Sequence, residues 1–337
     1  MISSKKQFLR VGIIGCGLIG KKRAAALDAM SVLVAASDTE ISRAKDLFYG
    51  REGYVTNDWQ KIVRSQDVDV VIVSTRHDSL AEITEAALCA GKHVLVEKPG
   101  AKNAAQIKRL IELSKSKNLK VHIGFNHRYH RSIRKAKSLS DQGVIGDLMF
   151  IRARYGHGGR IGYENEWRAD PAISGGGELI DQGSHLIDLT RYFLGEVSVV
   201  WGEARTFYWR MPVDDNCFMF LENDKHKVSF LHVSCTEWKN MFSMEIYGNK
   251  GKLELNGLGG SYGVERLTWY ENPEELGPPN TTSWEYPKQD NSWELEIKEF
   301  FDDIRFDRIP NSSLNDALAN LEIIEKIYER SGYDFSS

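Results

Sequence analysis

The feature that most constrains the fold is a regular alternation of two kinds of segment over the first 125 residues. Short runs of Val, Ile and Leu without polar alternation are separated by longer stretches with helical spacing. A strand that is apolar on both faces is buried on both faces, as in a parallel sheet covered by helices. The alternation therefore predicts a doubly wound α/β domain. The expected strands are 8–15, 31–38, 67–75, 93–99 and 119–125, and the expected helices are 18–30, 41–50, 81–92 and 104–118.

The pattern changes beyond residue 126. Strand-like runs separated by Gly, Asn and Asp follow a connecting helix that is expected over 127–143, and several of the runs alternate apolar and polar residues. This is typical of an antiparallel or mixed sheet with one exposed face. We therefore expect two domains, 1–126 and 127–337. The second should hold strands over 147–156, 197–209, 216–223, 226–238, 241–248, 251–257 and 264–270, a proline-rich loop over 273–290, and closing helices over 292–306 and 314–330.

Length and composition agree with this organisation. A chain of 337 residues is longer than one hydrophobic core usually supports. The net charge of −3 gives no reason to expect a nucleic acid or an anionic membrane as partner, and no apolar run is long enough to span a bilayer. We interpret the start as a tail followed by a strand, because glycines interrupt its apolar stretch. Cys16, Cys89, Cys217 and Cys235 lack the spacing of a zinc site or a disulfide framework, so we expect a cytoplasmic protein.

The first expected strand runs directly into Gly15-x-Gly17-x-x-Gly20 and then into a helix. In this context the first glycine permits a tight turn, the second lets a pyrophosphate approach the backbone, and the third lets the helix pack close to the strand. The motif predicts a dinucleotide-binding site, with Leu18 and Ile19 beside the cofactor at the helix N-terminus.

An acidic residue, Asp38, ends the second expected strand at the distance from the glycines that dinucleotide-binding units require. Its carboxylate would accept hydrogen bonds from the adenosine ribose and repel a 2′-phosphate, which favours NAD over NADP. Arg43 lies nearby and could accommodate that phosphate, so NADP remains the less favoured alternative.

Two further motifs carry charged side chains. "HVLVEKP" (93–99) ends an expected parallel strand with Glu97 and Lys98, at the sheet edge where such folds bind ligands. These charges either form an ion pair at the strand end or place Lys98 against nicotinamide ribose and a substrate hydroxyl. "GGGELIDQGSHLID" (175–188) puts Asp181, His185 and Asp188 on one face if the run is helical. That run is either a capped surface helix or the floor of a reactive site.

The order of these motifs, with "GFNHRYH" at 124–130, resembles the glucose–fructose oxidoreductase / inositol dehydrogenase / MocA family of NAD(P)-dependent sugar and polyol dehydrogenases. The resemblance covers nearly the whole chain. It implies a Rossmann domain followed by an α/β domain whose large open sheet mediates assembly into a homodimer or homotetramer. It also implies that 175–177 turn into an active-site helix, and that Lys98, Asp181 and His185 are catalytic.

The chemistry of alcohol oxidation assigns a role to each catalytic residue. His185 suits the base that takes the hydroxyl proton, because histidine titrates closest to neutral pH. Asp181 can orient it or bind a neighbouring hydroxyl, and Lys98 can stabilise alkoxide charge. Asp188 is expected to cap or pair locally. A metal site of Glu178, Asp181 and His185 lacks a further ligand cluster, and "HRYH" at 127–130 favours a ligand contact, so no metal is expected. The expected cofactor-binding residues are Gly15, Gly17, Leu18, Ile19, Gly20, Asp38, Arg43, Ser74, Thr75, His77, Glu97, Lys98 and Asn126.

Two segments bear on the substrate. In "STRHDSLAE" (74–82), Arg76 and His77 replace the Pro-Asn of the family's Thr-Pro-Asn pattern, which disfavours plain inositol. The loop 154–170 is rich in arginine and aromatic residues, which clamp anions and stack on sugar faces, and it suggests an acid-bearing or nucleotide-linked sugar. The expected substrate-binding residues are Lys98, Arg128, Arg154, His157, Tyr163, Trp167, Arg168, Asp181 and His185.

The predicted function is that of an NAD-dependent dehydrogenase that oxidises a secondary hydroxyl of a sugar or sugar derivative. One alternative is a redox-neutral glycosidase or eliminase that cycles hydride on tightly held NAD. The other is a dinucleotide-binding sensor without turnover, which the presence of Lys98, Asp181 and His185 disfavours.

Overall fold

The computed structural model describes residues 8–50 and 52–334, and the expected N-terminal tail lies outside these ranges. The described chain divides into two compact units. The first runs to Phe125 and also includes Trp293–Ala319, whereas the second comprises Asn126–Ser292 and the segment that begins at Asn320. The chain therefore first passes from one unit to the other between residues 125 and 126, within one residue of the expected domain boundary between 126 and 127.

The expected assignment of all residues beyond 126 to one domain is wrong for the segment Trp293–Ala319. Ile297, Phe300 and Phe301 of this segment are fully buried in the same hydrophobic core as the first strands of the chain. The segment returns to the first unit because its apolar helix face completes that core.

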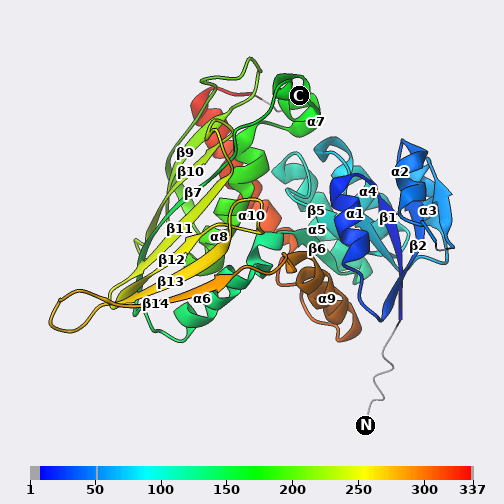
Figure 1. Ribbon diagram of the computed structural model, residues 1–337. Helices are drawn as coiled ribbons and strands as arrows, with labels where there is room; N and C mark the ends of the chain where they lie inside the picture. Colours follow the sequence, from blue (N-terminus) through cyan, green and yellow to red (C-terminus); the bar gives the residue numbers. More distant parts are fainter. Residues whose placement is uncertain (1–7, 51, 335–337) are drawn as a thin grey trace, which may run out of the picture. The chain divides into compact units, whose positions relative to one another are not determined.

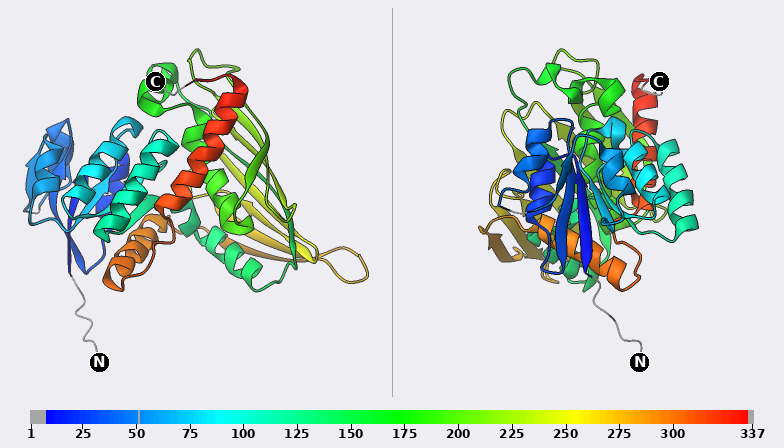
Figure 2. Two further views of the ribbon diagram at one scale, coloured as in Figure 1. Left: turned by 180° about the vertical axis from the view of Figure 1, so that it is seen from behind. Right: turned by 90° about the vertical axis from the view of Figure 1, so that its right-hand side faces the viewer.

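A six-stranded parallel sheet forms the first unit, with the order β3-β2-β1-β4-β5-β6. Helices lie on both of its faces (Figure 2), so the predicted doubly wound fold is confirmed. The short strand β3 and helix α3 were not expected from the sequence. The elements are β1 (Leu9–Ile14), α1 (Leu18–Ala25), β2 (Ser31–Ser37), α2 (Ile41–Asp46), β3 (Tyr54–Thr56), α3 (Trp59–Arg64), β4 (Val70–Val73), α4 (His77–Cys89), β5 (His93–Glu97), α5 (Ala104–Lys117), β6 (Val121–Gly124) and α9 (Ser292–Arg305).

The strand order reverses beside β1, because β2 pairs with one of its edges and β4 with the other. Open parallel sheets bind ligands at such a reversal, outside the carboxyl ends of the strands. Gly15 follows β1 and Ser74 follows β4, so the glycine motif lies at this point of the first unit.

The second unit is built on an eight-stranded sheet with the order β14-β13-β12-β11-β7-β10-β9-β8. Only β7 and β10 pair in parallel among the described strands of this sheet, which is therefore mixed, as expected (Figure 1). Its elements are α6 (Arg131–Asp141), β7 (Leu148–Gly156), α7 (Pro171–Ser174), α8 (Ser184–Leu194), β8 (Ser198–Arg205), β9 (Asn216–Glu222), β10 (Val228–Ser234), β11 (Met241–Gly248), β12 (Gly251–Asn256), β13 (Glu265–Glu271), β14 (Asn280–Tyr286) and α10 (Leu314–Ser331), with the short turns η1 (Asn126–Tyr129), η2 (Tyr163–Asn165), η3 (Trp167–Ala169) and η4 (Leu179–Gly183).

One strand of this sheet lies where a loop was expected. β14 occupies Asn280–Tyr286 and pairs antiparallel with β13, so the prediction of a loop over 273–290 is wrong for this stretch. Trp284 and Tyr286 alternate with polar residues, and the prolines are confined to the connection before the strand and the residue after it. The prolines on either side favoured a loop over the whole stretch and concealed the alternation of apolar and polar residues that is typical of a strand.

The two faces of the second sheet differ. Helices α6, α8 and α10 lie on one face (Figures 1 and 2). The other face carries aromatic side chains, including exposed Phe230 and Trp201 and the stacked pair Phe218 and His232, whose ring centroids are 4.3 Å apart. An exposed face of this composition is suited to contact between subunits.

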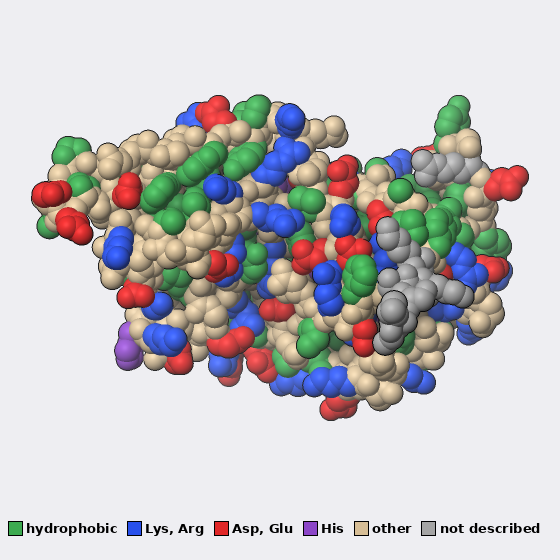
Figure 3. Space-filling model, turned by 90° about the horizontal axis from the view of Figure 1, so that it is seen from below, with side chains coloured by type: hydrophobic (Ala, Val, Ile, Leu, Met, Phe, Trp, Pro, Cys, Tyr) green, Lys and Arg blue, Asp and Glu red, His purple; other side chains and the backbone are tan. Residues whose placement is uncertain are grey.

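Side chains of both charge signs occur together on the face of the molecule that Figure 3 shows. On the face drawn in Figure 3, Lys and Arg side chains are interspersed with Asp and Glu. Within the described ranges, none of the helices combines the length and apolar character needed to cross a bilayer.

We predict that the exposed sheet face holds subunits together. Phe230→Asp should convert an oligomer into monomers, because it places a charge on the apolar face of β10. Phe306→Asp is the control, since Phe306 is a comparably exposed aromatic residue in the first unit (56% against 48% for Phe230). Light scattering coupled to size exclusion measures the mass, and an unchanged mass for Phe230→Asp would contradict the prediction.

Candidate functional site

The three glycines after β1 are required by different surroundings. Gly15 has a φ of +89°, and a Cβ there would lie 2.4 Å from the Ser74 carbonyl oxygen. A Cβ at Gly20 would lie 2.1 Å from the Gly15 carbonyl oxygen, so α1 packs against the turn. A Cβ at Gly17 would meet nothing within 4 Å. Packing within the protein therefore does not require glycine at position 17, which fits a position kept open for a phosphate.

The end of β4 is fastened to this glycine turn. The Ser74 hydroxyl donates to the Gly15 carbonyl oxygen at 2.6 Å, and the Thr75 hydroxyl accepts from Ser79 at 2.9 Å. His77 is the buried first residue of α4. Leu18 and Ile19 begin α1, and Leu18 is exposed. These expected cofactor contacts thus surround the same turn of the first unit.

Asp38 is held beside the glycine turn by backbone donors. Its carboxylate accepts from the Cys16 N–H at 2.7 Å and from the Glu40 N–H at 2.9 Å. Arg43, which could have favoured NADP, pairs with Glu40 at 2.8 Å. The negative charge of Asp38 is therefore fixed at the end of β2 while the nearby guanidinium has an acidic partner. This arrangement fits NAD better than NADP.

Glu97, one of the expected cofactor contacts, belongs to a buried ion network. Arg23 of α1, which is fully buried, donates from Nε to Glu97 at 2.7 Å and also pairs with Glu296 of α9. Burial raises the pKa of Glu97, although the Arg23 charge opposes this. Burial would also raise the pKa of Glu296, but Arg23 and His122 hold it below its usual value. The network fixes the residue that precedes Lys98 at the end of β5.

The triple glycine of the second unit is shaped by close packing. Gly175 and Gly176 have φ values of +76° and +149°. A Cβ at Gly176 would lie 2.3 Å from the Tyr328 hydroxyl, and one at Gly177 would lie 2.0 Å from the Asp214 carbonyl oxygen. The glycines therefore allow the chain to turn tightly around Tyr328 and Asp214 before the helix that follows.

Asp214 anchors this turn, and the sequence analysis did not identify it. Its fully buried carboxylate accepts from the Gly177 N–H at 2.9 Å, the Leu179 N–H at 2.7 Å and the Tyr328 hydroxyl at 2.7 Å. Burial raises the pKa of Asp214 to about 7, against the effect of these donors. No local pattern marks an aspartate that caps a turn 37 residues away.

Asp181 and His185 occupy adjoining turns rather than one regular helix. Asp181 lies in the wide turn η4, and His185 lies in the first turn of α8. Both are buried. The Asp181 carboxylate accepts from Arg168 Nε at 2.9 Å, and the His185 ring lies 3.7 Å from the ring of His127 between centroids. Tyr155 contacts both histidine rings edge-on. The second unit thus gathers an acid, a base and hydroxyl-bearing aromatic groups.

Asp188, which was expected to cap or pair locally, has a partner that is remote in sequence. Its carboxylate receives two hydrogen bonds from Arg128, at 2.9 and 2.6 Å, across 60 residues of sequence. Both side chains are buried and the Arg128 guanidinium is held by this carboxylate, while the expected substrate contact of Arg128 stays a prediction. Asn126, two residues earlier, is also buried and donates to the Ser292 hydroxyl at 3.3 Å. These contacts hold η1 against α8 and against Ser292 within the second unit.

Basic residues of the loop after β7 pair with acidic residues of the same loop and of the turn that follows the triple glycine. Arg168 bonds Asp181 and stacks over Trp167 at 4.5 Å, and Arg160 pairs with Glu166 at 2.6 Å. His157 lies 3.5 Å from Glu178. Burial would lower the pKa of His157, but the Glu178 carboxylate outweighs it and raises that pKa.

Arg154 does not join these residues. It is exposed on β7, next to Tyr155, which faces the histidines. Successive side chains of a strand point to opposite faces, so Arg154 lies on the open face of the sheet. This position does not favour the expected substrate contact of Arg154, which stays a prediction.

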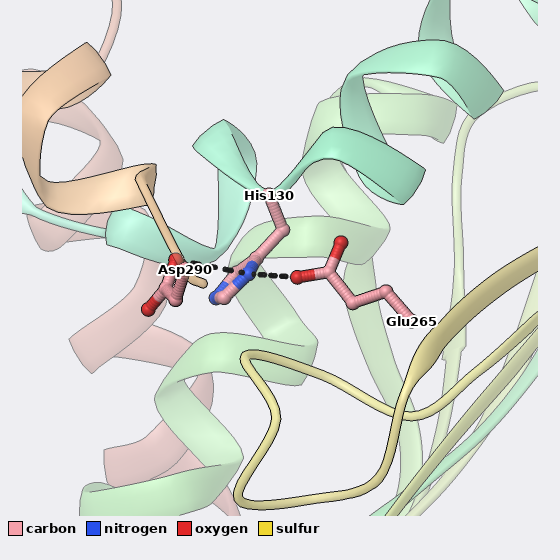
Figure 4. A group of neighbouring side chains, drawn as sticks. All are labelled: His130, Glu265 and Asp290. Atoms are coloured by element: carbon pink, nitrogen blue, oxygen red, sulfur yellow. Dashed lines mark hydrogen bonds and ion pairs between the residues drawn. The ribbon is translucent and has the colours of Figure 1, made fainter. Parts of the chain in front are cut away.

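One group of side chains has the composition of a metal site. His130, Glu265 and Asp290 lie together in the second unit (Figure 4), with His130 Nδ1 at 2.7 Å from Glu265 and 3.6 Å from Asp290. Glu265 also accepts from the Ser132 hydroxyl at 3.1 Å. Burial would raise the pKa of Glu265, but the His130 hydrogen bond and charge hold it at about 2. The geometry is that of a charged hydrogen-bond cluster.

Comparison with known proteins gives the class. Residues 9–125 match the GFO/IDH/MocA oxidoreductase family with an NAD-binding Rossmann fold, and 133–254 match the GFO/IDH/MocA C-terminal domain. The chain belongs to this family. It is 32% identical over 256 residues to dTDP-3,4-didehydro-2,6-dideoxy-alpha-D-glucose 3-reductase of Streptomyces violaceoruber, covering 74% of this chain and 72% of that protein.

Other relatives match over shorter regions. Levoglucosan dehydrogenase of Pseudarthrobacter phenanthrenivorans is 32% identical over 229 residues, 61% of this chain and 56% of its own length. Inositol 2-dehydrogenase of Salmonella typhimurium is 32% identical over 195 residues, 56% of this chain and 55% of its own length. The chain thus matches just over half the length of these two relatives. A solved levoglucosan dehydrogenase with NADH and levoglucosan has the same fold, with a TM-score of 0.86 and 24% identity over 96% of this chain and 97% of that one.

We predict that Asp38 sets the cofactor preference. Asp38→Ala should narrow the difference in affinity between NADH and NADPH, because it removes the ribose acceptor and the repulsion of a 2′-phosphate. Glu40→Ala should narrow it as well, by releasing Arg43. Fluorescence titration measures both affinities. Equal binding of the two cofactors by the unmodified protein would refute the assignment.

We predict that Asp214 makes stability depend on pH. A folded pKa of about 7, above the usual 3.8, means that the folded state holds the extra proton. The free energy of unfolding should therefore fall as pH rises from about 4 to about 7. Asp214→Asn should remove this contribution, so that denaturant titrations at pH 5 and pH 8 differ less for the variant by about 1 kcal/mol or more. A parallel pH dependence of both proteins would contradict the prediction.

Proposed function

We propose that this protein is an NAD-dependent dehydrogenase that oxidises a secondary hydroxyl of an uncharged sugar or sugar derivative. The observation that carries the proposal is the group of buried Asp181, His185 and His127 with half-buried Arg168, at the end of the sheet where the triple glycine turns into α8. Family relatives that act on levoglucosan, inositol and a dTDP-linked deoxysugar support this class of reaction.

The side chains of the two units would divide the work. The glycine turn and Asp38 would hold NAD, which would supply the hydride acceptor. His185 takes the hydroxyl proton, because its ring is buried among aromatic groups that exclude competing water. Asp181, oriented by Arg168, accepts a hydrogen bond from a neighbouring substrate hydroxyl. Lys98, which directly follows the fixed Glu97, supplies positive charge for the developing alkoxide.

The internal ion pairs favour an uncharged substrate. An acid-bearing or nucleotide-linked sugar was suggested by the arginines of the loop 154–170. Arg160 and Arg168 are paired with Glu166 and Asp181, and Arg154 lies on the other face of the sheet. A substrate anion would have to compete with a carboxylate already in place for each of the two paired guanidinium groups.

The cysteines bear on the cellular compartment in which the protein works. Cys16, Cys89, Cys217 and Cys235 are free thiols, and three of them are buried. Free buried thiols fit a reducing compartment, and we propose the cytoplasm. A redox-neutral enzyme or a sensor without turnover remains the alternative that the first experiment below decides.

NADH formation tests the proposal directly. With NAD present, a panel of free sugars, anhydrosugars, inositols, uronic acids and nucleotide sugars should give NADH with at least one uncharged sugar, and more slowly with its uronic acid. Turnover of a glycoside without free NADH would favour the redox-neutral reaction. NAD binding without any turnover would favour the sensor.

We predict that His185→Ala reduces kcat by about 10²–10⁴-fold. NAD affinity should stay nearly unchanged, because the glycine turn and Asp38 belong to the first unit. His226→Ala, at an exposed histidine of the second unit, is the control. Lys98→Ala should impair both turnover and cofactor placement, and Asp181→Asn should cost less than either. Near-normal turnover of His185→Ala would move the base to Lys98 or Tyr163.

A further inference from the structure

A line of aromatic rings leads from the candidate site to the surface of the second unit. The ring of His157, beside Glu178, contacts Tyr163 with centroids 5.6 Å apart, and Tyr163 contacts Trp209 at 5.5 Å. Trp209 contacts Tyr208 at 5.2 Å, and Tyr208 contacts Trp238 at 4.9 Å. Tyr163 is buried, whereas Tyr208 and Trp238 are 58% and 68% exposed. The line therefore begins at the polar site and ends in solvent.

The loops that carry these rings leave the same end of the sheet. Gly156, the last residue of β7, pairs with Met241 and Ser234, and Ser234 pairs with Asn216. The connections β7–α7, β8–β9 and β10–β11 are thus neighbours, at the upper end of the sheet in Figure 1. The candidate site and the exposed aromatic rings therefore lie at the same end of the sheet of this unit.

Buried groups hold the exposed rings in place. Asp215, which is fully buried, accepts from the backbone N–H groups of Phe207, Tyr208 and Trp209 at 2.7 to 3.0 Å. Trp209 Nε1 donates to the Cys235 carbonyl oxygen at 3.0 Å. The aromatic loop is therefore preorganised before any ligand arrives, which lowers the entropic cost of binding.

Trp238 is unusual in both backbone and side chain. Its φ is +60°, in the left-handed region that non-glycine residues rarely adopt, and its indole is largely exposed. The Glu237 N–H donates to the His157 carbonyl oxygen at 3.0 Å, which ties this loop to the site. Internal packing does not account for a large apolar side chain on a strained backbone at the surface. Such positions persist where function requires them.

We propose that Tyr208, Trp209 and Trp238 form a binding subsite for a second sugar ring, so that the substrates of this enzyme are glycosides. The C–H faces of a pyranose pack on aromatic rings, while its hydroxyls remain in water. The unbroken ring contacts from His157 to Trp238 place this surface next to the residues that would hold the reacting ring. The inference rests on the proposed function, because it assigns the distal part of the same substrate.

Calorimetric titration of the NADH-saturated protein tests the subsite without turnover. The probes are glucose and galactose, with cellobiose, maltose and lactose as their two-ring counterparts. The unmodified protein should bind at least one two-ring sugar more tightly than its one-ring counterpart. Trp238→Gly should weaken that binding about 5- to 10-fold and leave the one-ring sugar unchanged. Trp238→Tyr should retain most of the preference, and Tyr49→Ala, at an exposed aromatic residue of the first unit, should not alter it.

The variant Trp238→Gly also separates a ligand role from a structural one. Glycine adopts a φ of +60° without strain, so the melting temperature should not fall. A lower melting temperature or a changed oligomeric mass would make the ring a structural or subunit contact and overturn the subsite. So would equal binding of one-ring and two-ring sugars by the unmodified protein. Failure of all sugars to yield NADH, with binding still dependent on Trp238, would overturn the proposed function alone.

Discussion

The placement of the candidate catalytic residues depends on the contact between the Asp214 carboxylate and the triple-glycine turn. Three donors converge on this buried group, two of them from the backbone of residues 177 and 179. Because a buried donor without an acceptor is costly, the turn is confined to one conformation. Asp181 and His185 follow within the next few residues and inherit their positions from it. Gly176 and Gly177 are needed because a side chain at either position would displace Tyr328 or Asp214.

Charges near the candidate site are matched inside each unit. Arg23 serves Glu97 and Glu296 in the first, and Arg128 and Arg168 serve Asp188 and Asp181 in the second. A carboxylate held by a guanidinium keeps its orientation and its charge as substrate enters. This pairing fixes the geometry of the motifs. In the loop after β7, Arg160 and Arg168 each have an acidic neighbour.

Local periodicity and motif spacing predicted the two sheets, the glycine turn and the family, because these depend on neighbours in sequence. Partnerships across the fold were not accessible in the same way. Asp188 has the spacing of a local cap, yet Arg128 reaches it from 60 residues away. Arg154 has the charge of an anion clamp, but the alternation of β7 turns it to the open face. Asp214 carries no signal at all, since its role is defined by a turn that is remote in sequence.

The return of Trp293–Ala319 to the first unit has a consequence for synthesis. The strands of the first unit all precede residue 125, but Ile297, Phe300, Phe301 and the Glu296 carboxylate that pairs with Arg23 are synthesised more than 170 residues later. Its parallel sheet can pair early, whereas its core stays incomplete, and Arg23 lacks one of its two carboxylate partners, until residues 293–305 have been made. Folding of the nucleotide-binding half is therefore a late event, and no truncation after residue 125 can yield it whole.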